Sequence, residues 1–279
     1  MNIKIFRFDM FIFSAAYMLV LCIFLNPAYG TSDVPTVIRH ANEGFIVYVS
    51  HHFLSYLIYF LNNCLPSNLW YAALTYIATV ISMTMNLSVF KHYINDYRYF
   101  IIFILVYLLY LSMFILEIQF TQTSILIGIS SVLAFVHLYK NNAITFKKAA
   151  LLGLFMASSV LFRVRGFEAI IAIVFPLLLI IASSDVIDVW KSKITRKSLS
   201  LKWSFLLILL IPSLLIYGYD FIYKEYFSSP QYRQWHEFNK LRTDIHGNPT
   251  AELNSDNPDI YDNTGWSPDD YENFKSWFF

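Results

Sequence analysis

Charged residues and cysteines are scarce in this sequence of 279 residues, and each shortage excludes a class of protein. Charged side chains make up 14% of the chain and hydrophobic ones 57%, whereas a soluble domain carries about a quarter charged residues. The net charge is +1, which gives no basic surface of the kind that nucleic acids require. Of the two cysteines, Cys22 lies inside an apolar run and Cys64 outside it, which argues against a disulfide framework.

Several catalytic motifs are absent as well. The sequence contains no GxxxxGK[ST] loop for nucleotide phosphates and no GxSxG nucleophile elbow. It has no HxxxH or CxxC spacing, so no zinc site is predicted. The apolar segments hold few ionisable groups, which argues against an ion-coupled pump or a proton relay.

Long apolar segments dominate what is present. About 20 apolar residues are needed to cross the hydrocarbon core of a bilayer. The sequence therefore predicts an all-α, polytopic membrane helix bundle with about seven spans. These spans are predicted at residues 8–26, 69–90, 99–116, 121–139, 148–163, 167–184 and 204–223. The fifth and sixth belong to one apolar block that is interrupted by Arg163-Val164-Arg165-Gly166, which predicts a tight helical hairpin with arginines at its tip.

The segment 46–62 has two interpretations. Its length would just allow a span, but its polar residues recur at three- and four-residue steps, as on an amphipathic helix. These polar residues are Tyr48, His51, His52, Ser55, Tyr59 and Asn62. We favour a helix that lies in the membrane interface.

The N-terminal segment also has an alternative. Lys4 and Arg7 precede the apolar stretch, and Ala28-Tyr29-Gly30 is faintly similar to a cleavage site, as in a secretory signal peptide. We favour an uncleaved first span, because several more spans follow and Asp9 lies within the basic region.

The distribution of positive charge predicts the orientation of the chain. With the N-terminus in the cytoplasm, 12 of the 20 basic residues lie on the cytoplasmic side, and the outer loops carry Arg39, Arg163 and Arg165. This predicts a multi-pass protein of the bacterial inner (plasma) membrane. If 46–62 spans instead, the N-terminus lies outside and the later topology is unchanged.

Two regions then divide the chain. Residues 1–223 form the predicted transmembrane domain, whose first outer loop covers 26–68. Residues 224–279 form a small extracytoplasmic tail with ten acidic and five basic residues and several Tyr and Trp. Within it, Ser267-Pro268-Asp269-Asp270 has the composition of a helix start.

The arginine pair Arg163 and Arg165, followed by Glu168, is the sharpest candidate for a binding site. Guanidinium groups match phosphate oxygens, so an outer hairpin tip carrying two of them predicts a clamp for a phosphate or pyrophosphate. The alternative is that the arginines snorkel at the interface and that Glu168 neutralises one of them.

The first outer loop supplies the other candidates. Asp33 could act as a general base or help to hold a divalent cation such as Mg²⁺ or Mn²⁺. The alternative is that Asp33 belongs to a helix N-terminal cap, with Pro35 in the first turn of that helix. His51 and His52 are adjacent, so on a helix they point about 100° apart and do not suit one metal ion. We place them, with Arg39, among residues that contact a polar substrate. No motif requires a cofactor.

Short segments along the chain resemble multi-span proteins of bacterial surface-polysaccharide clusters. They are Ser32-Asp33, Leu65-Pro66, Asn68-Leu69-Trp70-Tyr71, Gln119-Phe120-Thr121-Gln122-Thr123, Phe162-Arg163-Val164-Arg165-Gly166-Phe167-Glu168, Phe238-Asn239-Lys240-Leu241-Arg242, Gly265-Trp266-Ser267-Pro268-Asp269-Asp270-Tyr271 and Trp277-Phe278-Phe279. The architecture resembles the GT-C class of integral-membrane glycosyltransferases. Asp33 departs from that class in having no acidic neighbour before Glu43.

The resemblance implies a glycosyltransferase that takes a sugar from a polyprenyl-phosphate carrier and passes it to a glycan acceptor. It implies Asp33 as the base and Arg163 and Arg165 as the residues that hold the lipid phosphate. Two other functions stay open: an O-antigen-type polysaccharide polymerase, and a flippase-like or accessory subunit that docks other cell-envelope proteins through its tail. Relatives would be expected to continue beyond Phe279, which predicts a truncated or split product.

Overall fold

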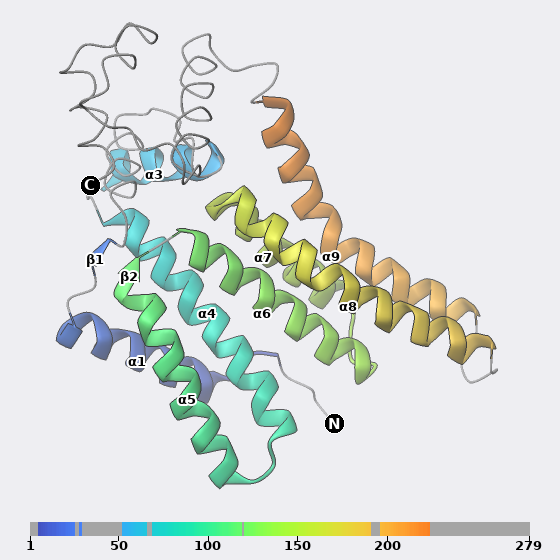
Figure 1. The fold of residues 1–279 in the computed structure, drawn as a ribbon. Coiled ribbons are helices and arrows are strands. Elements are labelled where there is room, and N and C mark those ends of the chain that lie inside the picture. The colour runs from blue at the N-terminus through green and yellow to red at the C-terminus, as the bar shows by residue number, and fades with distance from the viewer. Residues whose placement is uncertain are drawn as a thin grey trace, which may run out of the picture. The chain divides into compact units, whose positions relative to one another are not determined.

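The computed structural model describes residues 5–25, 28–29, 52–65, 69–118, 120–190 and 196–223. Most of the loop 26–68 and all of the tail 224–279 therefore lie outside the described residues. The described ranges form eight helices and a single pair of two-residue strands. The predicted all-helical class is confirmed for this part of the chain (Figure 1).

Each predicted span coincides with a helix. The helices are α1 (Phe8–Leu25), α3 (His52–Cys64), α4 (Trp70–Tyr93), α5 (Tyr97–Leu116), α6 (Phe120–Lys140), α7 (Phe146–Phe162), α8 (Val164–Trp190) and α9 (Arg196–Ile222). Within the described ranges, three stretches are long and apolar enough to cross a membrane, namely α4, α6 and Trp203–Ile222 of α9. The fold thus fits a helical membrane protein, and the number of spans stays a prediction.

Helices α8 and α9 are longer than the apolar segments that predicted them. Each has 27 residues, or about 40 Å of helix. Helix α8 continues through Asp185 and Asp188, and α9 begins with Arg196-Lys197. The apolar pattern ends at these charges, but a charged side chain leaves the backbone hydrogen bonds of a helix intact. Arg and Lys are also good helix formers, whereas Asp is a poor one that α8 nevertheless accommodates.

Helix α7 packs closely against α9 along a row of small residues. Ala149, Gly153 and Ala157 follow each other at four-residue steps and are all buried. A Cβ atom at Gly153 would lie 2.6 Å from the backbone oxygen of Ile208. The two helices therefore approach backbone to backbone, a packing that small residues permit in membrane helices.

Buried hydroxyl groups within the bundle are satisfied largely by their own helices. Thr79 donates to the carbonyl oxygen of Thr75 at 2.9 Å, and Ser131 donates to that of Ile127 at 2.8 Å. Such bonds to a carbonyl one turn earlier remove the need for a polar partner on another helix. They explain how α4 and α6 can be rich in Ser and Thr and still lie in an apolar interior.

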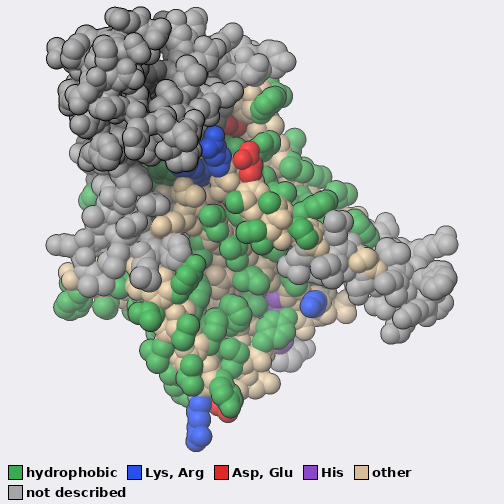
Figure 2. All heavy atoms as spheres, viewed as in Figure 1, with side chains coloured by type: hydrophobic (Ala, Val, Ile, Leu, Met, Phe, Trp, Pro, Cys, Tyr) green, Lys and Arg blue, Asp and Glu red, His purple; other side chains and the backbone are tan. Residues whose placement is uncertain are grey.

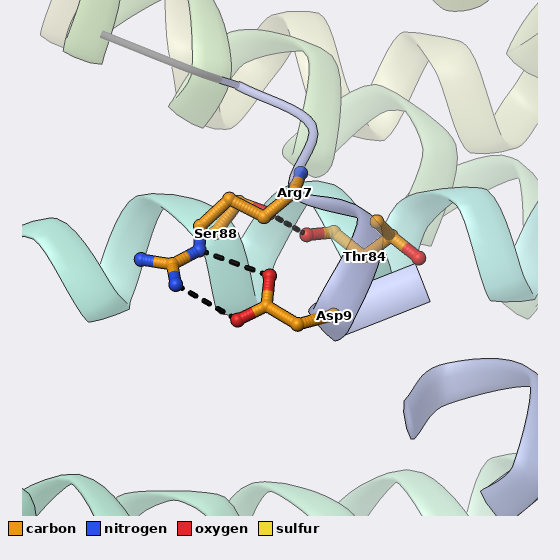
Figure 3. Close-up of polar contacts among 4 residues, drawn as sticks. All are labelled: Arg7, Asp9, Thr84 and Ser88. Carbon is orange, nitrogen blue, oxygen red and sulfur yellow. Dashed lines mark hydrogen bonds and ion pairs between the residues drawn. The ribbon is translucent and has the colours of Figure 1, made fainter. Parts of the chain in front are cut away.

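The N-terminal end of α1 is fixed against α4 (Figure 3). The backbone N–H of Arg7 donates to Ser88 Oγ at 3.1 Å, and that hydroxyl donates to the carbonyl oxygen of Thr84 at 2.6 Å. The Arg7 side chain donates two hydrogen bonds to the Asp9 carboxylate, at 3.1 and 2.8 Å. Hydrogen bonding to Asp9 raises the pKa of Arg7 above its ordinary value.

One end of the bundle gathers the described parts of the segments that the sequence predicts to be outside, namely α3, the strand pair and the turn at Arg163. We name it the α3 end. There, β1 (Ala28–Tyr29) pairs in parallel with β2 (Glu117–Ile118), with Tyr29 opposite Ile118. A hydrophobic cluster at this end joins α3, the starts of α4 and α6, and the end of α7. Its buried members include Leu54, Ile58, Tyr71, Phe120 and Phe162.

Helix α3 lies across the ends of the other helices rather than alongside them (Figure 1). Its 13 residues rise about 20 Å, which is less than the ~30 Å of a hydrocarbon core. The direction of α3 across the bundle (Figure 1) fits the interfacial interpretation, and residues 46–51 of the predicted segment lie outside the described residues. Its outward residues Tyr56 and Phe60 are exposed.

The surface of the bundle is strongly apolar. Figure 2 shows hydrophobic side chains spread over the visible face, with charged side chains in a few small groups. Phe24, Leu109, Ile173 and Leu215 are each more than two-thirds exposed. So large an apolar surface is untypical of a soluble monomer and suits contact with lipid.

Candidate functional site

Arg163 is the only residue between α7 and α8. Its backbone is extended, with φ −160° and ψ 121°, and its N–H caps α7 by donating to the carbonyl oxygen of Ser159 at 3.1 Å. Its own carbonyl oxygen accepts the N–H of Phe167 at 3.2 Å, which begins α8. The predicted break in the apolar block is therefore confirmed, and the chain reverses within one residue.

A buried hydroxyl holds this turn in place. Ser124 Oγ of α6 lies 2.9 Å from the carbonyl oxygen of Ser159, 3.0 Å from Ser159 Oγ and 3.1 Å from the carbonyl oxygen of Arg163. A Cβ atom at Gly166 would lie 2.5 Å from the same hydroxyl oxygen. Only glycine lets the first turn of α8 approach α6 this closely.

The two arginine side chains have different surroundings. The guanidinium of Arg163 is half-buried and lies over the ring of Phe120, with its Cζ 4.7 Å from the ring centroid. A cation–π contact of this kind fixes the direction of a long side chain. Arg165, two residues later in the first turn of α8, is exposed and makes no ion pair with the residues that the structure describes.

Glu168 does not neutralise either arginine in the described part of the chain. Its Oε1 accepts a hydrogen bond of 2.9 Å from the hydroxyl group of Tyr217 on α9. The ring of Tyr217 also lies 6.2 Å from that of Phe167. The carboxylate therefore joins α8 to α9 and leaves the charge of Arg165 available, so the alternative in which Glu168 pairs with an arginine is not what the structure shows.

The dipoles of two helices add to the positive charge of the arginines. Helices α6 and α8 both begin at the α3 end, where the positive ends of their dipoles attract an anion. This combination can bind a phosphate group through guanidinium forks and helix dipoles together.

Three predicted site residues, Asp33, Arg39 and His51, lie outside the described residues. His52 is the first residue of α3, and its side chain is not described. The predicted tail 224–279 also lies outside them. The structure thus places Arg163, Arg165 and Glu168 together and does not test the loop residues.

Two residues at this site were not predicted. Tyr217 supplies the partner of Glu168, and Asp220, one turn further along α9, has an exposed fraction of 2%. A carboxylate inside an apolar segment is a signal for function, and Asp220 carried that signal within the predicted span 204–223. The hydrogen bond of Tyr217 with Glu168, which lies 49 positions earlier in the chain, could not be predicted from the sequence.

A second polar cluster lies at the opposite end of the bundle. The His137 ring is buried, its Nδ1 lies 3.2 Å from the Tyr93 hydroxyl oxygen, and its centroid lies 4.7 Å from that of His92. Across the described ranges, no group of three or more His, Cys, Asp or Glu side chains is placed to hold a metal ion. The α3 end is therefore the stronger candidate site.

No protein-family model, curated protein or solved structure matches this chain.

Proposed function

We propose that the chain is an integral-membrane glycosyltransferase of surface-glycan assembly, which takes its sugar from a polyprenyl-phosphate carrier at the α3 end. The observation that carries this proposal is the arginine tip. Arg163 is aimed by its contact with Phe120, and Arg165 is exposed without an ion-pair partner among the described residues. A lipid-borne phosphate arriving along an apolar helix surface would meet both charges at the α3 end.

The arginines would hold the phosphate that leaves when the sugar is transferred. Negative charge grows on that phosphate as the glycosidic bond breaks, and fixed positive groups stabilise the growing charge. Arg163 is better fixed than Arg165, because the stacking on Phe120 and the hydrogen bonds of Ser124 constrain both its side chain and its backbone. Fixed charges need little reorganisation during reaction.

Asp33 is the proposed base that removes the proton of an acceptor hydroxyl group. Its loop begins at the α3 end, because Tyr29 pairs with Ile118 and Ile118 lies two residues before Phe120. Four residues of chain reach at most about 14 Å, so covalent geometry keeps Asp33 within that distance of Tyr29. This tether supports a shared location for the base and the arginine tip.

A transfer assay tests the proposal. Membranes from cells that make the full chain are incubated with undecaprenyl phosphate carrying radiolabelled glucose or N-acetylglucosamine. We expect chain-dependent transfer of one sugar to an acceptor, and Asp33→Asn should lower the rate at least about 100-fold, the usual contribution of a general base. Glu43→Gln in the same loop is the matched control and should keep wild-type transfer.

The products separate the competing functions. Lengthened glycan chains would instead support a polysaccharide polymerase. An absence of chain-dependent label in any acceptor would contradict the transferase, and unchanged transfer by Asp33→Asn would remove Asp33 from the role of base.

A further inference from the structure

Aromatic rings and carboxylates meet beside the arginine tip, where α3, α8 and α9 converge. Phe53 of α3 stacks on Tyr219 of α9, with centroids 5.1 Å apart and an angle of 11° between the rings. Tyr223 continues this surface, 6.2 Å from Tyr219. On the neighbouring side, Tyr217 donates to Glu168 at 2.9 Å. We call Phe53, Tyr219, Tyr223, Tyr217, Glu168 and Asp220 the aromatic–carboxylate cluster.

The periodicity of α9 places Asp220 inside this cluster. At about 100° per residue, the order around the helix is Tyr219, Tyr223, Asp220 and Tyr217, with neighbours about 40° to 60° apart. Tyr219 faces α3 and Tyr217 faces α8. Asp220 lies on the arc between them and is buried, so a second carboxylate lies where the three helices meet.

The exposed part of the cluster has the chemistry that recognises a sugar. Phe53 and Tyr219 are each 45% exposed, and Glu168 is exposed as well. A sugar ring has an apolar face of C–H groups, which suits aromatic rings, and a rim of hydroxyl groups, which donate hydrogen bonds to carboxylates. Aromatic side chains that only mark a membrane boundary need no such carboxylate beside them.

Glu168 also lies at the right place relative to the arginines. It follows Arg165 by three residues, and side chains at that spacing are neighbours on one face of a helix, with Cβ atoms about 5–6 Å apart. In a lipid-linked sugar, the phosphate and the sugar ring are directly bonded neighbours. A phosphate on Arg165 would therefore bring its sugar to Glu168 and the stacked rings.

We propose that the aromatic–carboxylate cluster is the sugar subsite of this site and that it selects an uncharged sugar over a uronic acid; the inference rests on the proposed function. Once a phosphate occupies the arginines, the exposed carboxylate that a sugar would meet in the cluster is that of Glu168. A carboxylate on the sugar would meet this like charge at short range, which disfavours binding.

Ligand binding to the full chain in lipid nanodiscs tests this subsite. The probes are undecaprenyl phosphate alone and the same lipid carrying glucose, N-acetylglucosamine or glucuronic acid. We expect at least one neutral sugar to bind about 10-fold more tightly than the bare phosphate, and glucuronic acid to give no such gain. The double variant Phe53→Ala/Tyr219→Ala should lose the gain and keep the affinity for the bare phosphate.

Two further variants sharpen the result. Phe60→Ala removes an exposed ring from the same helix α3, outside the cluster, and should leave every affinity unchanged. Glu168→Gln should reduce the difference in affinity between the neutral and the acidic sugar probes, because it removes one negative charge. Retained affinity for the bare phosphate shows that each variant is folded.

Several results would overturn the subsite. The first is that the bare phosphate binds as tightly as every sugar-bearing probe, and the second is that the glucuronic acid probe binds more tightly than the neutral ones. The third is that the Phe53→Ala/Tyr219→Ala variant keeps the full gain in affinity that a neutral sugar gives. None of these three results would contradict phosphate binding by Arg163 and Arg165. Failure of all four probes to bind would instead contradict the proposed function, so the two failures are distinguishable.

Discussion

Replacing Arg163 and Arg165 together by glutamine should weaken the binding of undecaprenyl phosphate at least about 100-fold. Each guanidinium can donate a forked pair of hydrogen bonds to phosphate oxygens. A hydrogen bond to a charged group contributes about 1.5–3 kcal/mol, and a loss of 1.4 kcal/mol lowers affinity about tenfold. The dissociation constant of the full chain in nanodiscs, measured by titration with the lipid, gives the result directly.

Two matched variants identify the cause of that loss. Lys140→Gln/Lys147→Gln removes two exposed charges at the opposite end of the bundle and should leave binding unchanged. Arg163→Lys/Arg165→Lys keeps the charge but removes the planar fork, so an intermediate loss of about tenfold is expected. If Arg163→Gln/Arg165→Gln and Lys140→Gln/Lys147→Gln lose lipid affinity equally, net charge and not the arginine tip attracts the lipid.

Gly153→Ala should lower the free energy of unfolding by roughly 1–3 kcal/mol, the usual cost of overpacking. The added Cβ atom would lie 2.6 Å from the Ile208 carbonyl oxygen and 3.2 Å from that of Leu209. Backbone atoms cannot move aside as a flexible side chain can, so α7 and α9 must separate. Thermal unfolding of the purified chain in one mild detergent measures the effect.

Gly218→Ala on α9 is the matched control, because a Cβ atom there would have no neighbour within 4 Å. It should be neutral or slightly stabilising, since alanine is a better helix former than glycine. Identical melting temperatures for the two variants would show that α7 and α9 do not approach as closely as described.

Hydropathy and charge predicted much of the fold. Long apolar stretches identified the helices, and the interruption at Arg163-Val164-Arg165-Gly166 correctly located a helical reversal. The stripe of polar residues in 46–62 anticipated α3, although the described helix begins at His52 and ends at Cys64. These features are local along the chain, which is why a single sequence reveals them.

Contacts between distant residues could not be predicted in the same way. The bond of Glu168 with Tyr217, the fit of Gly166 against Ser124, and the pairing of Tyr29 with Ile118 each depend on which helix faces which. Helix periodicity shows which residues share a face of one helix, but not the neighbour that this face meets. Asp33, Arg39 and His51 stay predictions because they lie outside the described residues.

The central claim is that the Asp33 loop and the arginine tip open to the same aqueous compartment. Single cysteines at positions 33, 165 and 147, introduced into a Cys22→Ser/Cys64→Ser background, can be treated in intact spheroplasts with a membrane-impermeant maleimide. The account predicts that positions 33 and 165 react from outside and that position 147 reacts only after the membrane is opened. Reaction of positions 33 and 165 from opposite sides would contradict it.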